Sequence, residues 1–228
     1  MAESAQPRSR RERPAKPALT RDGIIETAVR LMRAEGLERV TMRRLATELD
    51  TGPASLYVYV ANTAELHAAV LDDLIGEVDL TPAAAAGDWR ERTEAVLVSY
   101  GHVLYEHGRL AHSALLARPS GANYLRLLEA LLALLVEGGV PDAQAAWGVD
   151  VLLQGVTASV AEHSQDDPAH SDEDWHAVTA AVNNASPATT PHVAALASQL
   201  LSGTPRLRQK WQIQMALSGI AHTPIPTA

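Results

Sequence analysis

The chain has 228 residues, which is enough for one or two domains with a sizeable hydrophobic core. It contains no cysteine, so disulfide frameworks and cysteine-based metal or nucleophile chemistry are excluded. The net charge of −8 is unevenly spread, because residues 1–66 carry 11 Lys and Arg against 9 Asp and Glu, and residues 67–228 carry 8 against 18. A DNA-binding face is judged by its own charge, so the acidic total does not exclude a nucleic-acid partner.

Alanine and leucine dominate the composition, and no long run alternates apolar with polar residues as a β-strand would, so we expect an all-α protein. No apolar stretch reaches the ~18–20 residues that a membrane-spanning helix needs. The Arg-rich start of the chain lacks the apolar segment of a secretory signal. We therefore expect a cytoplasmic protein without a membrane partner.

Residues 1–19 are polar, rich in arginine and interrupted by proline. Such a segment cannot bury a core, so we predict a disordered basic arm. Two interpretations are open for this arm. It adds phosphate or minor-groove contacts to a DNA complex, or it is a solvated tail.

The first predicted helix begins after Thr20, runs to about Glu35 and ends at Gly36. Its arginines are expected to form a solvated face and not to contact DNA. The opposite face would supply the core against which the following helices pack, and it consists of Ile24, Ala28, Leu31 and Met32.

A second helix is predicted to begin at Thr41. Residues 50–52 end it, and its buried face has apolar residues spaced i, i+3, i+4 and i+7, namely Met42, Leu45, Ala46 and Leu49. Pro53 then suits the first turn of another helix, because its missing N–H costs nothing there. That helix is short, and its inward positions are Leu56 and Val60.

Asn62 is placed to cap the next helix, with Glu65 completing a capping box, and we expect the helix to reach about Val78. Two short helices joined by a tight turn form a helix-turn-helix, whose second helix enters the DNA major groove. The helix that follows joins this helix-turn-helix unit, which we call the reading head, to the rest of the chain. It is therefore the natural lever between the two parts.

These residues resemble the TetR family of one-component bacterial regulators. The resemblance rests on Thr41-x-Arg43-Arg44-Leu45-Ala46-x-x-Leu49, followed by Gly52-Pro53-Ala54-Ser55-Leu56-Tyr57-x-Tyr59-Val60-x-Asn62-x-x-x-Leu66. It implies a three-helix DNA-binding domain over residues 20–66, with the lever continuing to about residue 79. It also implies a helical effector-binding and dimerisation domain over residues 80–228. The family pattern usually has a phosphate-contacting lysine after Asn62; this chain has Thr63, whose hydroxyl and helix start can still serve.

Roles within the motif follow from position. Thr41 is expected to bond a phosphate through its hydroxyl and N–H, and Arg43 to reach a phosphate or a guanine edge. Arg44 also lies off the buried face. Tyr57 is expected to bond a phosphate, and Tyr59 to do the same or to touch bases. The predicted DNA-binding set is Thr41, Arg43, Arg44, Gly52, Pro53, Ala54, Ser55, Tyr57, Tyr59 and Thr63.

The remaining chain is predicted to be helical, with breaks at Gly, Pro and acidic stretches. Tyr124–Val136 is apolar nearly all round, which indicates a central buried helix. Residues 164–174 are acidic and expected to be exposed. The predicted helices are Trp89–His107, Arg109–Ala117, Tyr124–Val136, Pro141 to about Glu162, Trp175–Val182, His192–Leu201 and Pro205–Ala221.

This order is similar to the C-terminal domain of the Tet-class repressors. By that resemblance, the helix around Ala145–Val160 and the last helix, Pro205–Ala221, pair with their copies in a second subunit as a four-helix bundle. The long apolar faces late in the chain need covering, and a two-fold homodimer suits a palindromic double-stranded operator. Residues 164–191 look like an insertion relative to that class.

The expected place for a small-molecule effector is a mostly apolar pocket between the central helices. Ala114 stands at the position that matches the magnesium-binding histidine of tetracycline-responsive relatives, so tetracycline–magnesium is not expected. Three histidines spaced five apart scatter around a helix, so we expect no metal and no cofactor. For every effector candidate a core or surface role is the alternative, and the candidates are Tyr100, His102, Tyr105, His112, Tyr124 and Trp147.

The sequence has no P-loop, G-x-S-x-G or H-E-x-x-H motif, so an enzyme is not expected, and Asp72 and Asp73 are interpreted as solvated charge. We expect a ligand-responsive transcriptional regulator, a dimeric repressor that a small molecule releases from its operator. An activator of the same family is the alternative, and a helical scaffold without DNA binding is a third possibility.

Overall fold

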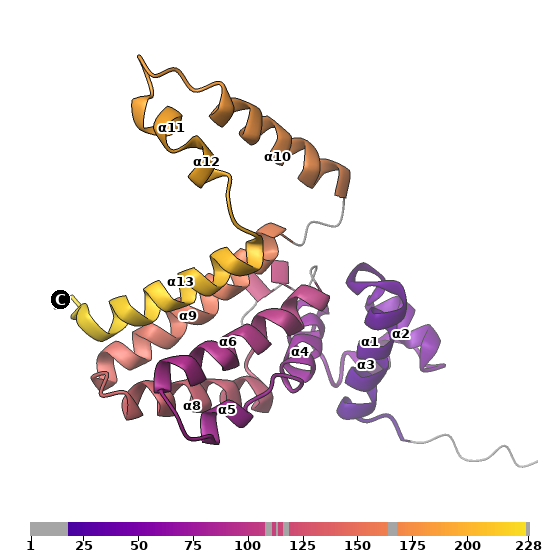
Figure 1. Ribbon diagram of the computed structural model, residues 1–228. Helices are drawn as coiled ribbons and strands as arrows, with labels where there is room; N and C mark the ends of the chain where they lie inside the picture. Colours follow the sequence, from indigo (N-terminus) through magenta and orange to yellow (C-terminus); the bar gives the residue numbers. More distant parts are fainter. Residues whose placement is uncertain (1–17, 108–110, 113, 116–118, 164–167, 227–228) are drawn as a thin grey trace, which may run out of the picture.

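The computed structural model describes residues 18–107, 111–112, 114–115, 119–163 and 168–226, and no strand occurs among them. The first helices of the chain form one end of the molecule, the helix that begins at Thr63 connects them to a helical bundle, and a further helical arm projects from that bundle (Figure 1). The prediction of an all-α fold is confirmed. The predicted basic arm lies outside the described residues, except for its last two.

The N-terminal unit comprises α1 (Arg21–Glu35), the 3₁₀ turn η1 (Leu37–Arg39), α2 (Met42–Glu48), α3 (Pro53–Leu56) and α4 (Thr63–Ile75). Side-chain caps begin three of these helices, as the sequence predicts. The hydroxyl of Thr20 accepts from the N–H of Gly23 at 3.1 Å, and that of Thr41 from Arg44 at 3.2 Å. Asn62 Oδ1 accepts from the N–H of Glu65 at 2.8 Å. Each cap satisfies an amide that the helix itself leaves unbonded.

The bundle contains α5 (Thr81–Ala84), α6 (Trp89–Glu106), α8 (Ala122–Glu137), α9 (Asp142–His163) and α13 (Pro205–His222). Helices α9 and α13 lie side by side along most of their length (Figure 1). They approach closely because glycine faces the partner helix: a Cβ on Gly148 would lie 2.7 Å from Ile220, and one on Gly155 would lie 2.9 Å from Gln212. The core of the bundle is formed by apolar residues of α6, α8, α9 and α13.

Helices α10 (Pro168–Asn183), α11 (Pro191–Ala195) and α12 (Ala197–Leu200) form the arm that projects from the bundle between α9 and α13 (Figure 1). They pack on one another. The stretch predicted as an insertion is thus a separate helical unit. Helix α10 begins at Pro168, earlier than the predicted Trp175, because proline is well suited to a helix start and the acidic residues after it do not interrupt the helix.

Three further boundaries differ from the sequence prediction. Helix α4 ends at Ile75 and not at Val78, because the backbone turns at Gly76. The single helix expected over residues 192–201 is split at Leu196 into α11 and α12. The helix expected over residues 109–117 lies partly outside the described residues, and those that are described there are helical. In the described ranges no helix is long and apolar enough to cross a membrane.

Candidate nucleic-acid interface

The turn between α2 and α3 is built around a left-handed residue. Asp50 has a φ of 49°, and the next amide, that of Thr51, donates to the carbonyl of Ala46 at 2.8 Å. Aspartate is one of the few non-glycine residues that adopt this conformation readily. Gly52 itself has a φ of −82° and caps α3 in an extended conformation. Gly52 is therefore not needed for the turn, and its lack of a side chain leaves space in front of α3.

Helix α3 presents its first residues to solvent and its last residue to the core. Leu56 is fully buried and Val60 nearly so, and these two anchor the segment. The residues before Leu56 are exposed, as the sequence predicts for a probe that enters a groove; they are Gly52, Pro53, Ala54 and Ser55.

The two tyrosines of this segment differ in their surroundings. Tyr57 follows the last residue of α3, and 52% of it is exposed. Tyr59 lies beyond the helix and is partly buried against the core, so it has less freedom to reach DNA than the sequence suggests. Val58, which sequence reasoning missed, is 80% exposed. The signal for Val58 was present, because the inward positions on either side of it were already assigned to Leu56 and Val60.

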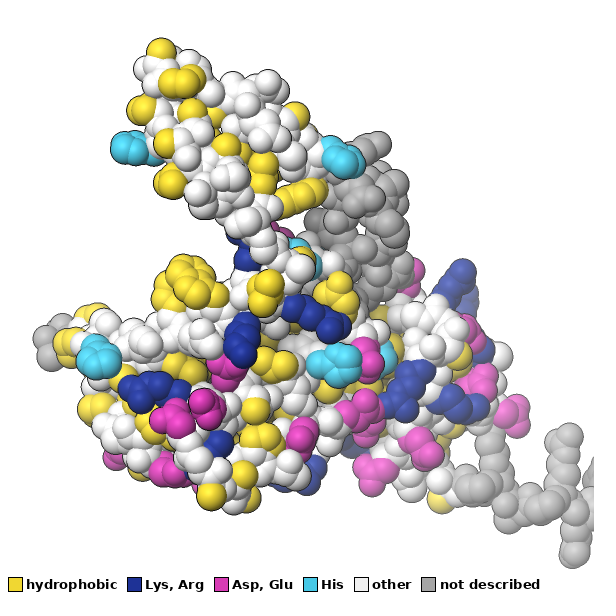
Figure 2. Space-filling view, in the orientation of Figure 1, with side chains coloured by type: hydrophobic (Ala, Val, Ile, Leu, Met, Phe, Trp, Pro, Cys, Tyr) yellow, Lys and Arg dark blue, Asp and Glu magenta, His cyan; other side chains and the backbone are white. Residues whose placement is uncertain are grey.

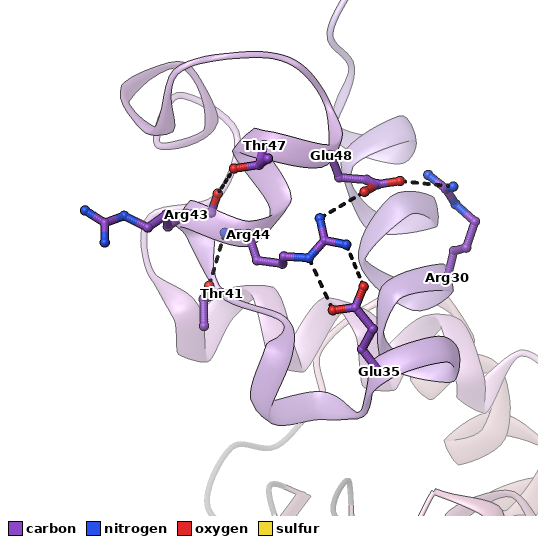
Figure 3. Close-up of polar contacts among 7 residues, drawn as sticks. All are labelled: Arg30, Glu35, Thr41, Arg43, Arg44, Thr47 and Glu48. Atoms are coloured by element: carbon purple, nitrogen blue, oxygen red, sulfur yellow. Dashed lines mark hydrogen bonds and ion pairs between the residues drawn. The ribbon is translucent and has the colours of Figure 1, made fainter.

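The start of α2 adds two exposed polar groups beside this probe. The Arg43 side chain points away from the protein (Figure 3). The Thr41 hydroxyl accepts from the Arg44 amide as a cap, and its own O–H remains able to donate to a phosphate oxygen. Thr63 is exposed as the first residue of α4, where helix amides face outward. These three residues therefore lie where contacts to a DNA backbone are feasible.

Arg44 has a different place from the one that the sequence prediction gives it. Its guanidinium is directed back onto α1, where it binds Glu35 at 2.5 Å and 3.2 Å, and it also binds Glu48 at 2.9 Å (Figure 3). Glu48 in turn lies 3.3 Å from Arg30. The hydrogen bond from Arg44 lowers the pKa of Glu35 below its ordinary value. Because both carboxylates hold it, Arg44 joins α2 to α1 and is not directed toward a DNA ligand; the helical pattern showed that it lies off the core face but not which charges it meets.

The six effector candidates are not gathered around one cavity. Tyr100 is buried, and its hydroxyl lies 2.9 Å from that of Thr157 on α9, which itself donates to the carbonyl of Leu153. Burial raises the pKa of Tyr100 to about 12. Tyr124 on α8 is partly buried against the same core. The remaining four lie at the surface and are His102, Tyr105, His112 and Trp147.

Two of the exposed candidates, Tyr105 and His102, contact charged side chains at the surface. The guanidinium of Arg206 lies over the Tyr105 ring at 5.6 Å, which links the start of α13 to the end of α6. His102 lies 3.4 Å from Glu106, one turn further along α6. Trp147 is exposed on α9. Tyr100 and Tyr124 therefore face the core, and the other four candidates have the surface location that was the alternative for each of them.

A groove of about 1080 Å³ lies elsewhere, between α1, α4 and the start of α8. Its walls are charged and carry both signs, including Arg30, Arg33, Glu26 and Asp73. Burial raises the pKa of the Asp73 carboxyl. Its lining comes mainly from α1 and α4, with Ser120, Gly121 and Asn123 at the start of α8. In the parts of the chain that the structure describes, no three His, Asp or Glu side chains are placed to hold a metal ion.

Comparison with known proteins gives two family matches. Residues 24–70 match the model of bacterial regulatory proteins of the tetR family, and residues 81–208 match the tetracyclin repressor-like C-terminal domain. The Streptomyces transcription regulator SCO7704 is a similar solved structure, with 56% identity and a TM-score of 0.80 over 93% of this chain and all of that one. The Streptomyces coelicolor protein ActR, in its apo form, is 32% identical with a TM-score of 0.80 over 90% of this chain and 97% of that one.

ActR has also been solved in complex with actinorhodin, and that structure covers 89% of this chain and 97% of its own at a TM-score of 0.78. Among curated proteins, the HTH-type transcriptional repressor DrrR1 of Streptomyces coeruleorubidus is 42% identical over 87 residues, which is 38% of this chain and 32% of that protein. The alignments with the curated relatives span 58% or less of those proteins' own lengths.

Proposed function

This chain belongs to the TetR family of bacterial transcriptional regulators, and from that membership we propose that it is a dimeric repressor that binds a palindromic operator and that a small molecule releases. Three separate features support this proposal: an exposed probe on α3, an uncovered apolar face on α9 and α13, and a buried polar pair between α6 and α9. DrrR1, a relative over part of the chain, is named a repressor.

The observation that carries the DNA-binding part is the contrast in exposure along α3 and the residues that follow it as far as Val60. Leu56 and Val60 are buried, while Ser55, Tyr57 and Val58 between and before them face solvent. Small residues at the start of the probe allow its backbone to approach base edges. Tyr57 is suited to bond a phosphate, and the Val58 side chain to touch a thymine methyl group.

The groups around the probe fit the phosphate backbone. Thr41, Arg43 and Thr63 lie at the starts of α2 and α4, where hydroxyls, a guanidinium and free helix amides are available. Arg43 supplies the positive charge, because Arg44 is held by two carboxylates. Arg44 thus stabilises the reading head from behind, and we do not retain it as a DNA ligand.

The dimer is supported by the outer face of α13. Leu207, Trp211 and Met215 are spaced four residues apart and are all exposed, while Ile213 and Leu217 on the opposite side are buried in the core. A helix that is apolar on both faces needs cover on both. Hydrophobic side chains stand out over α13 in the space-filling view (Figure 2).

Helix α9, beside α13, adds Trp147 and Val151 one turn apart, both exposed. Together these five side chains form a candidate interface, which we call the bundle face: Trp147, Val151, Leu207, Trp211 and Met215. A second copy of this chain placed on it by a two-fold axis would complete a four-helix bundle. It would also present two copies of α3 to half-sites about one DNA turn, ~34 Å, apart.

The effector part rests on the likeness to ActR, which binds actinorhodin in its solved complex. We place the corresponding site in the bundle, near Tyr100 and Tyr124, because these two of the six candidates face the core. Tyr100 and Thr157 are buried and hydrogen-bonded to each other, and their hydroxyl groups are suited to hydrogen-bond a hydroxyl or carbonyl group of a ligand. The ligand itself is expected to be mostly apolar, with a few polar groups.

In the proposed mechanism α4 is the lever between effector and operator. Ligand in the bundle favours a state in which α4 holds the two reading heads away from operator spacing. A difference of about 3–5 kcal/mol in ligand affinity between the two states gives a useful switch. Because its proposed partner is DNA inside the cell, we propose that the protein acts in the cytoplasm.

The test is a gel shift against the DNA upstream of the chain's own gene, with wild type and with Tyr57→Ala, at several salt concentrations. A specific, salt-sensitive band that Tyr57→Ala weakens supports the regulator. Absence of any salt-sensitive binding indicates the scaffold alternative. A transcription assay with the same DNA separates a repressor from an activator, since added protein lowers the transcript in the first case and raises it in the second.

A further inference from the structure

Helix α8 begins without a cap of its own. Its N-cap residue is Gly121, which has no side chain to accept from the first-turn amides. The missing acceptor comes from a different helix. Asp72, near the end of α4, receives the N–H of Tyr124 on Oδ1 at 2.9 Å and that of Asn123 on Oδ2 at 3.4 Å. The expectation that Asp72 is a solvated charge is therefore wrong.

The contact is reciprocal. The side-chain amide of Asn123 donates to the backbone carbonyl of Asp72 at 2.8 Å, so each residue bonds the backbone of the other. A carboxylate at a helix N-terminus is stabilised both by the amides and by the helix dipole. We call this arrangement of Asp72, Asn123 and the Tyr124 amide the α4–α8 latch.

Two glycines make room for the latch. A Cβ on Gly121 would lie 2.0 Å from Asp72 Oδ2, which leaves no space for any side chain at that position. A Cβ on Gly76 would lie 3.0 Å from the Asn123 amide nitrogen and 2.9 Å from the carbonyl of Asp73. The absence of side chains at both sites thus permits α4 and the start of α8 to meet at hydrogen-bonding distance.

The position of the latch gives it a role beyond capping. It lies where α4 packs on α8, beside the groove between α1, α4 and the start of α8. On one side, α4 carries the reading head. On the other, Tyr124 offers its amide to Asp72 while its ring packs against the core near Tyr100. A shift of the first turn of α8 is therefore passed to α4 by these hydrogen bonds as well as by the packing of the two helices.

We propose that the α4–α8 latch is the joint that fixes the orientation of the reading head relative to the effector-binding bundle, with Asp72 as its positioning residue. This proposal rests on the proposed function and names how its two sites are coupled. While the latch is closed, α4 moves with α8. When it is open, the head swings on α4 independently of the bundle.

The experiment measures head orientation directly, by pulsed electron spin resonance. The chain has no cysteine, so Arg39→Cys in η1 and Ala133→Cys on α8 give two labelling sites, both exposed. Labelled protein is diluted with an excess of unlabelled chain, so that only the distance within one chain is read. The latch is then opened in two independent ways, by Asp72→Ala and by Gly121→Ala. Asp73→Ala is the matched control, since Asp73 is the adjacent acidic residue and its side chain makes no hydrogen bond to the described residues of α8.

We expect a narrow distance distribution for the wild type and for Asp73→Ala, and a broader one for both latch variants, with no further broadening in the double variant. Affinity for the operator, measured on unlabelled proteins, is expected to fall roughly 2- to 30-fold in the latch variants. This fold-change corresponds to the usual stability cost of losing a helix cap, on the assumption that DNA binding restores the closed latch. Thermal melting identifies any variant that fails to fold, and the other latch variant then decides.

Unchanged distributions in folded Asp72→Ala or Gly121→Ala protein would overturn the latch while leaving DNA binding by the wild type intact. Broadened distributions together with a wild type that binds no DNA would keep the latch as a joint and overturn the proposed function instead. The two failures are therefore distinguishable. A merely structural cap would lower the melting temperature without changing the distance between the labels.

Discussion

Replacing Trp211 by alanine tests whether the bundle face is a dimer interface. In the single chain 64% of this side chain is exposed. A tryptophan offers up to ~250 Å², so roughly 160 Å² stays in water until a partner covers it. At ~25 cal/mol per Å² that area corresponds to about 4 kcal/mol per copy. The partner covers only part of this area and alanine keeps part of the contact, so we take half of this value, roughly 2 kcal/mol per copy, as the expected loss.

A two-fold interface contains the residue twice. Since about 1.4 kcal/mol is a factor of ten, the dimer dissociation constant is expected to rise about 30-fold for one copy and up to about 1,000-fold for both. Sedimentation equilibrium over a range of protein concentrations measures this constant. Trp175→Ala is the matched control, because Trp175 is also about half exposed, at 51%, but lies on the projecting arm and not on α9 or α13.

The chain should remain folded in both variants, because neither tryptophan belongs to the buried core. Circular dichroism and thermal melting check this point. A Trp211→Ala protein that dimerises as tightly as wild type would refute the assignment of the bundle face. A wild type that stays monomeric at micromolar concentrations would refute it as well.

Three further predictions concern the reading head and the bundle. Gly52→Ala should leave the fold intact or stabilise it by about 0.4–1 kcal/mol, because nothing lies within 4 Å of the new Cβ. The same variant should weaken operator binding about tenfold. Equal affinity of wild type and variant in anisotropy titrations would show that DNA does not approach this residue. Tyr100→Phe should destabilise the bundle by about 1 kcal/mol through loss of the bond to Thr157, and an unchanged denaturation midpoint would contradict that. Arg44 lowers the pKa of Glu35, so the ionised Glu35 carboxylate stabilises the reading head fully at pH values above its unfolded pKa of about 4.3, and this stabilisation is lost as the pH falls further. Thermal melts between pH 3 and 6 should therefore show a steeper fall of melting temperature with falling pH for wild type than for Glu35→Gln. Identical slopes would argue against this contribution.

Local spacing in the sequence was sufficient to predict the helix starts of the reading head. Thr20, Thr41 and Asn62 all cap as expected, because a cap depends only on residues three positions apart. The second half of the predicted capping box differs in detail: Glu65 accepts from the amide of Ala61 at 2.7 Å and not from that of Asn62. The exposure of Ser55 and Tyr57 also followed from the positions left over by the buried Leu56.

What the sequence could not supply was the partner of each polar side chain. Arg44 and Asp72 both looked like surface charges, yet one holds α1 and the other caps α8, and both contacts join residues far apart in the chain or on different helices. Periodicity assigns a residue to a face but not to what that face meets. The same limit applies to the effector candidates, since Tyr100 is buried and Trp147 is exposed although both are aromatic residues on bundle helices.

The central claim is that the exposed segment of α3 reads duplex DNA and that two copies do so together. Hydroxyl-radical footprinting on DNA selected by the protein from a random pool tests it most directly. We predict two equivalent protected half-sites related by a dyad, with centres a whole number of helical turns apart, and loss of both in Tyr57→Ala. A pool that enriches no sequence, or a footprint with a single half-site, would contradict the account.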